Sequence, residues 1–106
     1  MKCWGFNMSG ALGYGDEDDR GLMANQMGDY LPLVNLGITF PPNFISTGFG
    51  YTCIIFSNYQ LKCYGQNDGG QLGLETTFHQ GDNANEMGTY LPFLNLGTGV
   101  EISKSK

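Results

Sequence analysis

Two of the three cysteines are placed where a disulfide could form. Cys53 and Cys63 lie at equal distances from Asn58, in the run YTCIIFSNYQLKCYG at residues 51–65. Two apolar segments flank a polar break in this run, which is typical of a β-hairpin with a four-residue connection. In an antiparallel pair folded about Asn58, the two thiols face each other within disulfide reach. The alternative is two reduced, buried cysteines, and we predict the disulfide.

The other residues that could do chemistry give weaker signals. Catalysis needs a nucleophile beside a base, and the single histidine, His79, lies in a polar loop with no cysteine nearby. The acidic run DEDD at residues 16–19 could bind a hard cation such as Ca²⁺. Sixty positions further on, residues 76–79 carry no carboxylate, so a solvated acidic loop is the favoured interpretation. We therefore predict no enzyme activity and no metal or cofactor site.

The tripeptide Asn7-Met8-Ser9 matches the acceptor pattern for N-glycosylation. In the alternative interpretation, the Asn7 side chain forms hydrogen bonds within its own turn. Disulfides persist in oxidising surroundings, so Asn7 and the cysteine pair together predict an extracellular or cell-surface location. The alternative location is cytoplasmic or nuclear. A hairpin partner for Cys3 would lie ten residues before it, outside the sequence, which leaves the pairing of Cys3 open.

Composition and charge predict an all-β protein and exclude two classes of partner. Seventeen glycines, with 41% apolar and 13% aromatic residues, are typical of short strands joined by tight turns. The net charge is −5 with only five basic residues, which disfavours a nucleic-acid partner. No run of apolar residues is long enough to span a membrane.

The chain resembles itself at a shift of 60 residues. Residues 2–37, the N-terminal segment, align without a gap on residues 62–97, the C-terminal segment, with 18 identities in 36 positions. Most of the shared residues are Gly, Asn and Pro at turns, or apolar residues in predicted strands. We interpret this as a tandem repeat with a period of 60.

Predicted strands at residues 44–48, 51–56, 61–64 and 90–97 make one four-stranded antiparallel unit of the propeller-blade type. The N-terminal segment has counterparts of the last two strands only, at residues 1–4 and 30–37. We therefore expect about one and a half blades: a partial repeat at 1–37, a full repeat at 38–97, and the start of another repeat or a tail at 98–106. The predicted repeat core consists of equivalent pairs: Trp4 with Tyr64, Leu12 with Leu72, and Leu36 with Leu96.

The run GFGYTCIIFSNYQLKCYGQNDGGQLGL and its partial earlier copy KCWGFNMSGALGYGD resemble the repeat of the regulator of chromosome condensation family. That repeat builds a β-propeller, usually with seven blades. Three positions depart from its pattern, since Tyr51 replaces a histidine, Tyr64 a tryptophan and Ala11 a glutamine. The insert GLMANQMGDYLPLVNLG, repeated as GDNANEMGTYLPFLNLG, resembles a long-repeat, cysteine-containing branch of the family.

The resemblance implies a scaffold whose loops meet partners, and no catalytic residue of the family can be carried over. We expect a non-catalytic structural or interaction module, which could belong to an extracellular assembly or filament. The alternative is an intracellular propeller that regulates a small GTPase or a ubiquitin pathway. Because the chain is too short to close a propeller, its protein partner would be further repeats of a longer chain or copies of itself. A self-sufficient monomer is the third alternative.

Overall fold

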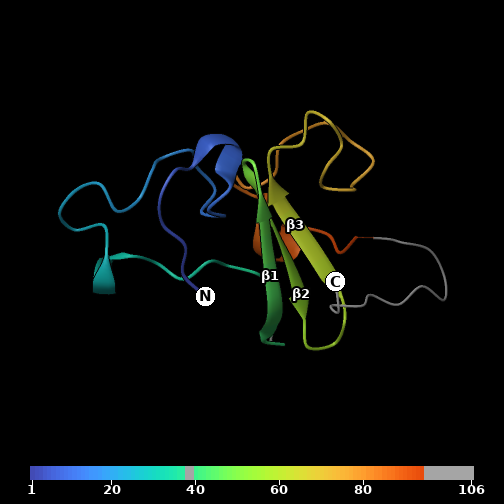
Figure 1. The fold of residues 1–106 in the computed structure, drawn as a ribbon, viewed down its shortest axis with the longest axis horizontal. Helices are drawn as coiled ribbons and strands as arrows, with labels where there is room; N and C mark the ends of the chain where they lie inside the picture. Colours follow the sequence, from blue (N-terminus) through green and yellow to red (C-terminus); the bar gives the residue numbers. More distant parts are fainter. Residues whose placement is uncertain (38–39, 95–106) are drawn as a thin grey trace.

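The fold is a three-stranded antiparallel sheet with long loops on either side (Figure 1). A computed structural model describes residues 1–37 and 40–94. The strands are β1 (Pro42–Gly48), β2 (Tyr51–Phe56) and β3 (Leu61–Gly65), in the order β1-β2-β3. Three short 3-10 helices complete the secondary structure: η1 (Met8–Gly10), η2 (Gly28–Tyr30) and η3 (Gly88–Tyr90). The prediction of an all-β protein is confirmed.

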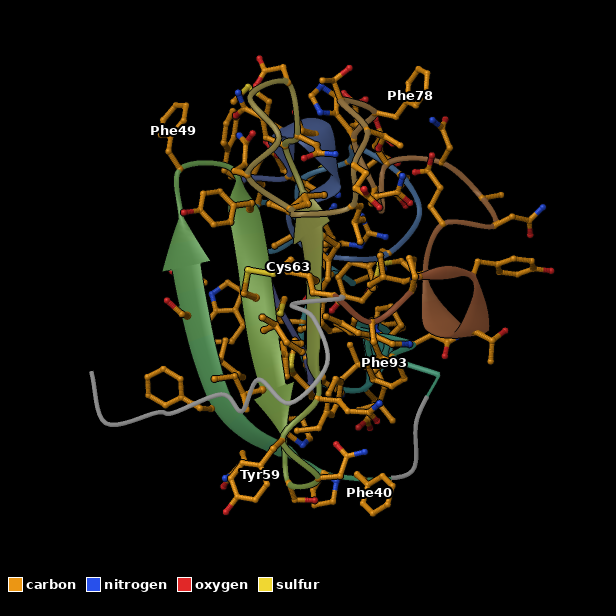
Figure 2. The ribbon with its side chains drawn as sticks, turned by 90° about the vertical axis from the view of Figure 1, so that its right-hand side faces the viewer. Phe40, Phe49, Tyr59, Cys63, Phe78 and Phe93 are labelled. Carbon is orange, nitrogen blue, oxygen red and sulfur yellow. A yellow bond between two sulfur atoms is a disulfide. The ribbon has the colours of Figure 1, made fainter. Side chains whose placement is uncertain are left out.

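The hairpin of β2 and β3 has the predicted register. Cys53 lies opposite Cys63, and the pairing is symmetric about Asn58. The amide of Tyr59, which has a φ of 64°, donates to the carbonyl of Phe56 and so closes the turn. The two cysteines form a disulfide, visible at Cys63 in Figure 2. The predicted disulfide is therefore confirmed.

Strand β1 is the exposed edge of the sheet. It pairs with β2 alone, and all seven of its residues are exposed. A proline, which has no N–H to donate, is tolerated at its first residue, Pro42, because an edge strand has an unpaired side. The register shifts between Pro42 and Phe44, which marks an irregularity at this end.

The segments at residues 1–4, 30–37 and 90–97 differ from the predicted strands. Where they are described, each is extended chain or 3-10 helix, and residues 95–97 lie outside the described part. Within the described part of this segment, one backbone hydrogen bond, from Leu94 to Leu61 at 2.9 Å, reaches β3, where a fourth strand would have made a ladder. Gly88, at a φ of 67°, turns the chain into η3, and the proline two residues after η3 has no N–H for a ladder.

The core lies on one face of the sheet and draws on both segments. Thr52, Ile54 and Phe56 alternate into it along β2, as expected for a strand with one buried face. The central cluster consists of Val34, Leu36, Ile54, Phe56, Tyr64, Met87 and Leu91. Of the predicted core residues, Tyr64, Leu12, Leu72 and Leu36 are buried. Leu96 lies outside the described residues.

Trp4 was predicted to be buried like Tyr64, and this is wrong. Its side chain is 61% exposed, whereas that of Tyr64 is fully buried. Tyr64 lies on β3, beside β2 and beneath Gly13 of the N-terminal segment. Among the described residues, nothing covers Trp4 in either way, because residues 1–4 have no neighbouring strand.

No helix among the described residues is long and apolar enough to cross a membrane.

Candidate interaction surface

One asparagine organises the long turn of each segment. The side chain of Asn67 is fully buried and donates to the carbonyls of Thr76 and Phe78, both at 2.9 Å. Its Oδ1 accepts from the amide of Leu72 at 3.0 Å, which directs the Leu72 side chain into the core. The asparagine therefore replaces the backbone partners that an irregular turn lacks.

Asn7 makes the same set of hydrogen bonds 60 residues earlier. It is also fully buried, donates to the carbonyls of Asp16 and Asp18, and accepts from the amide of Leu12. Its side-chain nitrogen is the atom that a glycan would occupy, and that nitrogen already serves these acceptors. Asn7 is therefore wrong as a glycosylation candidate in this fold, and the alternative interpretation, an asparagine bonded within its turn, is confirmed.

The backbone amide of each asparagine also finds a side-chain acceptor. The Asn7 amide donates to Oδ1 of Asp19 at 2.7 Å, and the Asn67 amide donates to Nδ1 of His79 at 2.9 Å. The single histidine is thus an acceptor for a turn, at the position that an aspartate fills in the N-terminal segment. Among residues 1–37 and 40–94, no nucleophilic side chain forms a hydrogen bond with His79.

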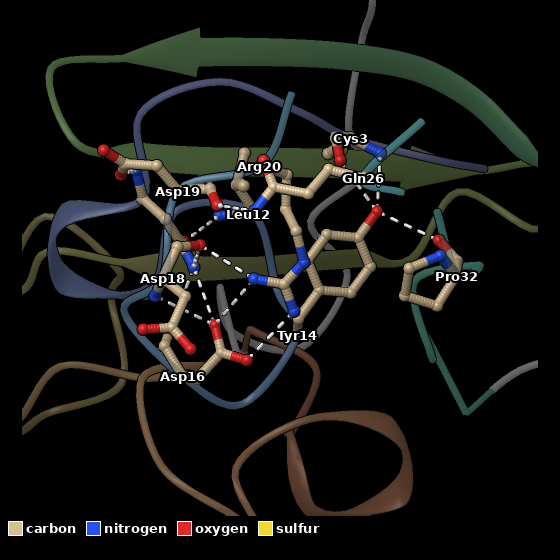
Figure 3. Close-up of polar contacts among 10 residues, drawn as sticks. Cys3, Leu12, Tyr14, Asp16, Asp18, Asp19, Arg20, Gln26 and Pro32 are labelled. Atoms are coloured by element: carbon tan, nitrogen blue, oxygen red, sulfur yellow. Dashed lines mark hydrogen bonds and ion pairs between the residues drawn. The ribbon is translucent and has the colours of Figure 1, made fainter. Parts of the chain in front are cut away.

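In the acidic run at residues 16–19, the carboxylates of Asp16 and Asp19 accept hydrogen bonds within the chain, whereas Glu17 and Asp18 are exposed (Figure 3). Asp16 forms an ion pair with Arg20 at 3.0 Å, and the Arg20 guanidinium lies 4.7 Å from the centre of the Tyr14 ring. The hydrogen bond from Arg20 lowers the pKa of Asp16, an effect that partial desolvation opposes. No group of three or more possible metal ligands occurs among the residues of the described ranges.

In each segment, one side-chain oxygen also caps the loop that follows the long turn, at residues 21–23 and 81–83. Oε1 of Gln26 accepts from the amides of three consecutive residues, 21–23, and Oε1 of Glu86 does the same for residues 81–83. Burial, followed by a hydrogen bond to Asp82, raises the pKa of Glu86. Asn25 and Asn85 have φ values of 68° and 67° in these loops. The two loops therefore have matching backbones and different charges.

The two segments meet along a surface with two sides. The acceptor face, from the N-terminal segment, consists of Gly10, Gly13, Asn35 and Leu36. The docking face, from the C-terminal segment, consists of Lys62, Gly81, Met87 and Gly88. These residues were not predicted as an interface, although all eight are among the identities of the 60-residue alignment.

Glycines let the two backbones approach closely. A β-carbon on Gly10 would lie 2.6 Å from the carbonyl oxygen of Gly81. A β-carbon on Gly88 would lie 2.6 Å from Nδ2 of Asn35, and the Gly88 amide donates to the Asn35 carbonyl at 2.8 Å. Larger residues at either glycine would force the faces apart.

Lys62 connects the two faces by hydrogen bonds. Its side chain is 2% exposed, and Nζ donates to the carbonyls of Leu36 at 2.9 Å and of Gly88 at 3.0 Å. The ammonium also lies 4.7 Å from the centre of the Phe93 ring, within cation–π range. Desolvation lowers the pKa of Lys62. Carbonyl dipoles and an aromatic face are therefore the groups that compensate this buried charge.

Cys3, the residue 60 positions before Cys63, is free and half-buried in the described structure. Its amide and carbonyl both bond to the hydroxyl of Tyr14, at 3.0 and 2.8 Å. Burial raises the pKa of the Cys3 thiol. A thiol in this state is less nucleophilic than an exposed cysteine.

Comparison of the chain with protein-family models, with curated proteins and with solved structures found no match in any of the three.

Proposed function

We propose that the chain is a non-catalytic interaction module built from repeats that resemble those of the regulator of chromosome condensation family. Successive units stack through an acceptor face and a docking face, and their long loops remain free to meet protein partners. The observation that carries this proposal is the contact between Lys62 and Leu36, a buried bond between equivalent units rather than within one.

The duplicated hydrogen bonds support a repeat with a period of 60. Asn7 and Asn67 bond to equivalent carbonyls, and Gln26 and Glu86 cap equivalent loops. The loops differ where they face solvent, with exposed Leu22 and Met23 in the first and Asp82 and Asn83 at the same places in the second. A constant frame with variable loops is typical of repeat proteins that bind other proteins.

An extracellular setting is part of the proposal, and the Cys53–Cys63 disulfide supports it. Peptide mapping of the protein from its natural source under non-reducing conditions tests this part. Recovery of both cysteines as free thiols would favour the alternative, an intracellular propeller that regulates a small GTPase or a ubiquitin pathway.

The stacking of units can be tested within one chain. In a chain that carries residues 38–97 twice in tandem, the added unit should raise the free energy of unfolding, because each new interface adds a term to the stability of a repeat array. In the matched control, Gly70→Asn in the first of the two units blocks the new interface and should remove the added stability. A second control carries Gly70→Asn in the last unit, outside the new interface, and should keep the added stability. If the added unit unfolds independently in all three chains, the repeat interpretation fails.

A further inference from the structure

Each half of the internal interface has an unused counterpart elsewhere in the chain. The residues 60 positions before the docking face are Lys2, Gly21, Met27 and Gly28. The described residues 60 positions after the acceptor face are Gly70 and Gly73. The chain therefore carries a second docking face near its start and a second acceptor face in its C-terminal segment.

One glycine of each counterpart, Gly28 and Gly70, is uncovered, whereas a β-carbon on Gly73 would lie 2.9 Å from the Leu94 side chain of its own segment. A β-carbon on Gly88 or Gly10 would collide with the opposing segment, but one on Gly28 or Gly70 would have no atom of the described residues within 4 Å. Their φ values, 65° and 75°, match those of their partners at 67° and 78°. The backbones thus already have the conformation of a docked pair, with no neighbour in place.

The side chains of the second docking face are uncovered in the same way. Met27 is 41% exposed, against 8% for Met87. Lys2 is exposed, and its Nζ donates to the carbonyl of Gly28 at 2.9 Å, as Lys62 does to Gly88. Lys62 has a further bond across the interface to Leu36, and Lys2 has no such bond in the described structure.

We propose that the face made by Lys2, Gly21, Met27 and Gly28 binds the Gly70–Gly73 face of a second copy of this chain, head to tail. This inference rests on the proposed function and names the partner for its stacking surface. A second copy is the partner because every molecule carries a docking face and an acceptor face of the kind that already bind each other within the chain. Because the two faces differ, a pair of bound copies still has one free face of each kind, and the contact propagates into a filament.

Two variants that each block one face test the proposal. Gly28→Asn and Gly70→Asn place a side chain in open space within the monomer, and asparagine tolerates a positive φ better than other residues. Either added side chain would meet the neighbouring copy. In sedimentation velocity, the wild-type chain should form a concentration-dependent series of oligomers, and each variant alone should be monomeric.

The decisive sample is an equal mixture of the two variants. Gly28→Asn keeps a free acceptor face and Gly70→Asn keeps a free docking face, so the mixture should give one-to-one dimers that grow no further. Phe49→Ser is the control, because it removes a 79% exposed aromatic ring from the β1–β2 turn and should leave the wild-type series unchanged.

Three results would overturn the inference: a wild-type chain that stays monomeric up to about 1 mM, oligomers that persist in either variant, or a mixture that remains monomeric. The tandem chain described above separates this inference from the proposed function. Added stability in the tandem chain with no association between separate chains would leave the repeat module standing and remove only self-association.

Discussion

The ammonium of Lys62 lies 2.9 Å from the carbonyl oxygen of Leu36, 26 residues earlier in the sequence, and both groups are buried. Lys62→Met keeps the aliphatic length but leaves the Leu36 and Gly88 carbonyls without their donor. We expect a loss of about 2 kcal/mol in the free energy of unfolding, because a buried polar group without a partner costs about 1–3 kcal/mol. Urea denaturation measures this loss.

Lys2→Met is the matched control for Lys62→Met. Lys2 is exposed and water can replace its bond to Gly28, so the change should be below about 0.5 kcal/mol at a concentration where the chain is monomeric. Equal effects at the two positions would show that the bond across the interface contributes nothing.

Asn67→Ala should be among the most destabilising single changes in the chain. It removes two donated hydrogen bonds and one accepted bond from a fully buried side chain. With about 1 kcal/mol for each bond, the expected loss is about 3 kcal/mol in chemical denaturation. Asn83→Ala, which alters an exposed side chain in the next loop, is the control, and a similar loss there would contradict the assignment.

Replacing His79 by aspartate should be tolerated better than replacing it by alanine. Aspartate can accept from the Asn67 amide as Asp19 accepts from the Asn7 amide, whereas alanine leaves that amide unpaired. We expect a loss of about 1 kcal/mol for His79→Ala and less than about 0.5 kcal/mol for His79→Asp. Thermal unfolding at neutral pH compares the two, and the reverse order would show that the imidazole ring contributes by packing.

The Asp16–Arg20 pair predicts a dependence on pH. The hydrogen bond from Arg20 lowers the folded-state pKa of Asp16 below its unfolded value of about 3.9. The pair therefore stabilises the fold above that pH, and the contribution is lost as the pH falls through the folded-state pKa. Asp16→Asn should destabilise the chain at pH 6 by less than about 1 kcal/mol, since the pair is partly exposed.

The difference between wild type and Asp16→Asn should shrink in urea titrations as the pH falls through the folded-state pKa of Asp16, because the wild-type carboxylate is then protonated. A difference that stays constant from pH 6 to pH 2 would mean that the carboxylate charge is not what stabilises the turn.

The hairpin was the most predictable part of the fold. Cys53 and Cys63 are symmetric about Asn58, and a period-2 pattern with one polar break leaves one register that buries Ile54 and Phe56. Residues 90–94 were mistaken for a strand because apolar alternation also suits extended chain that packs on a core without a ladder. Pro92 was the available warning, since proline cannot donate to a neighbouring strand.

The interface between the segments was harder to predict because its residues have ordinary roles elsewhere. A lysine in a strand usually points into solvent, but Lys62 is buried against Leu36 of the other segment and against Gly88 and Phe93 of its own. The sequence did contain a signal for this interface, since Lys2 is identical to Lys62 and Asn7 to Asn67. Polar side chains that face solvent are free to differ between repeats, so identical polar residues indicate a structural role. Trp4 was wrongly predicted to be buried for the converse reason. Burial of its side chain would need a neighbouring strand, and none lies beside it among the described residues.

The disulfide between β2 and β3 changes how the chain would carry tension. Cys53 and Cys63 are opposite one another, so a pull on the two ends passes through the sulfur bridge and bypasses the turn between them. The ten-residue separation withholds about 35 Å of contour length from extension until the bridge is reduced. In a filament of such chains, each subunit would stretch less under load in its oxidised form, and reduction would release a fixed increment of length per subunit.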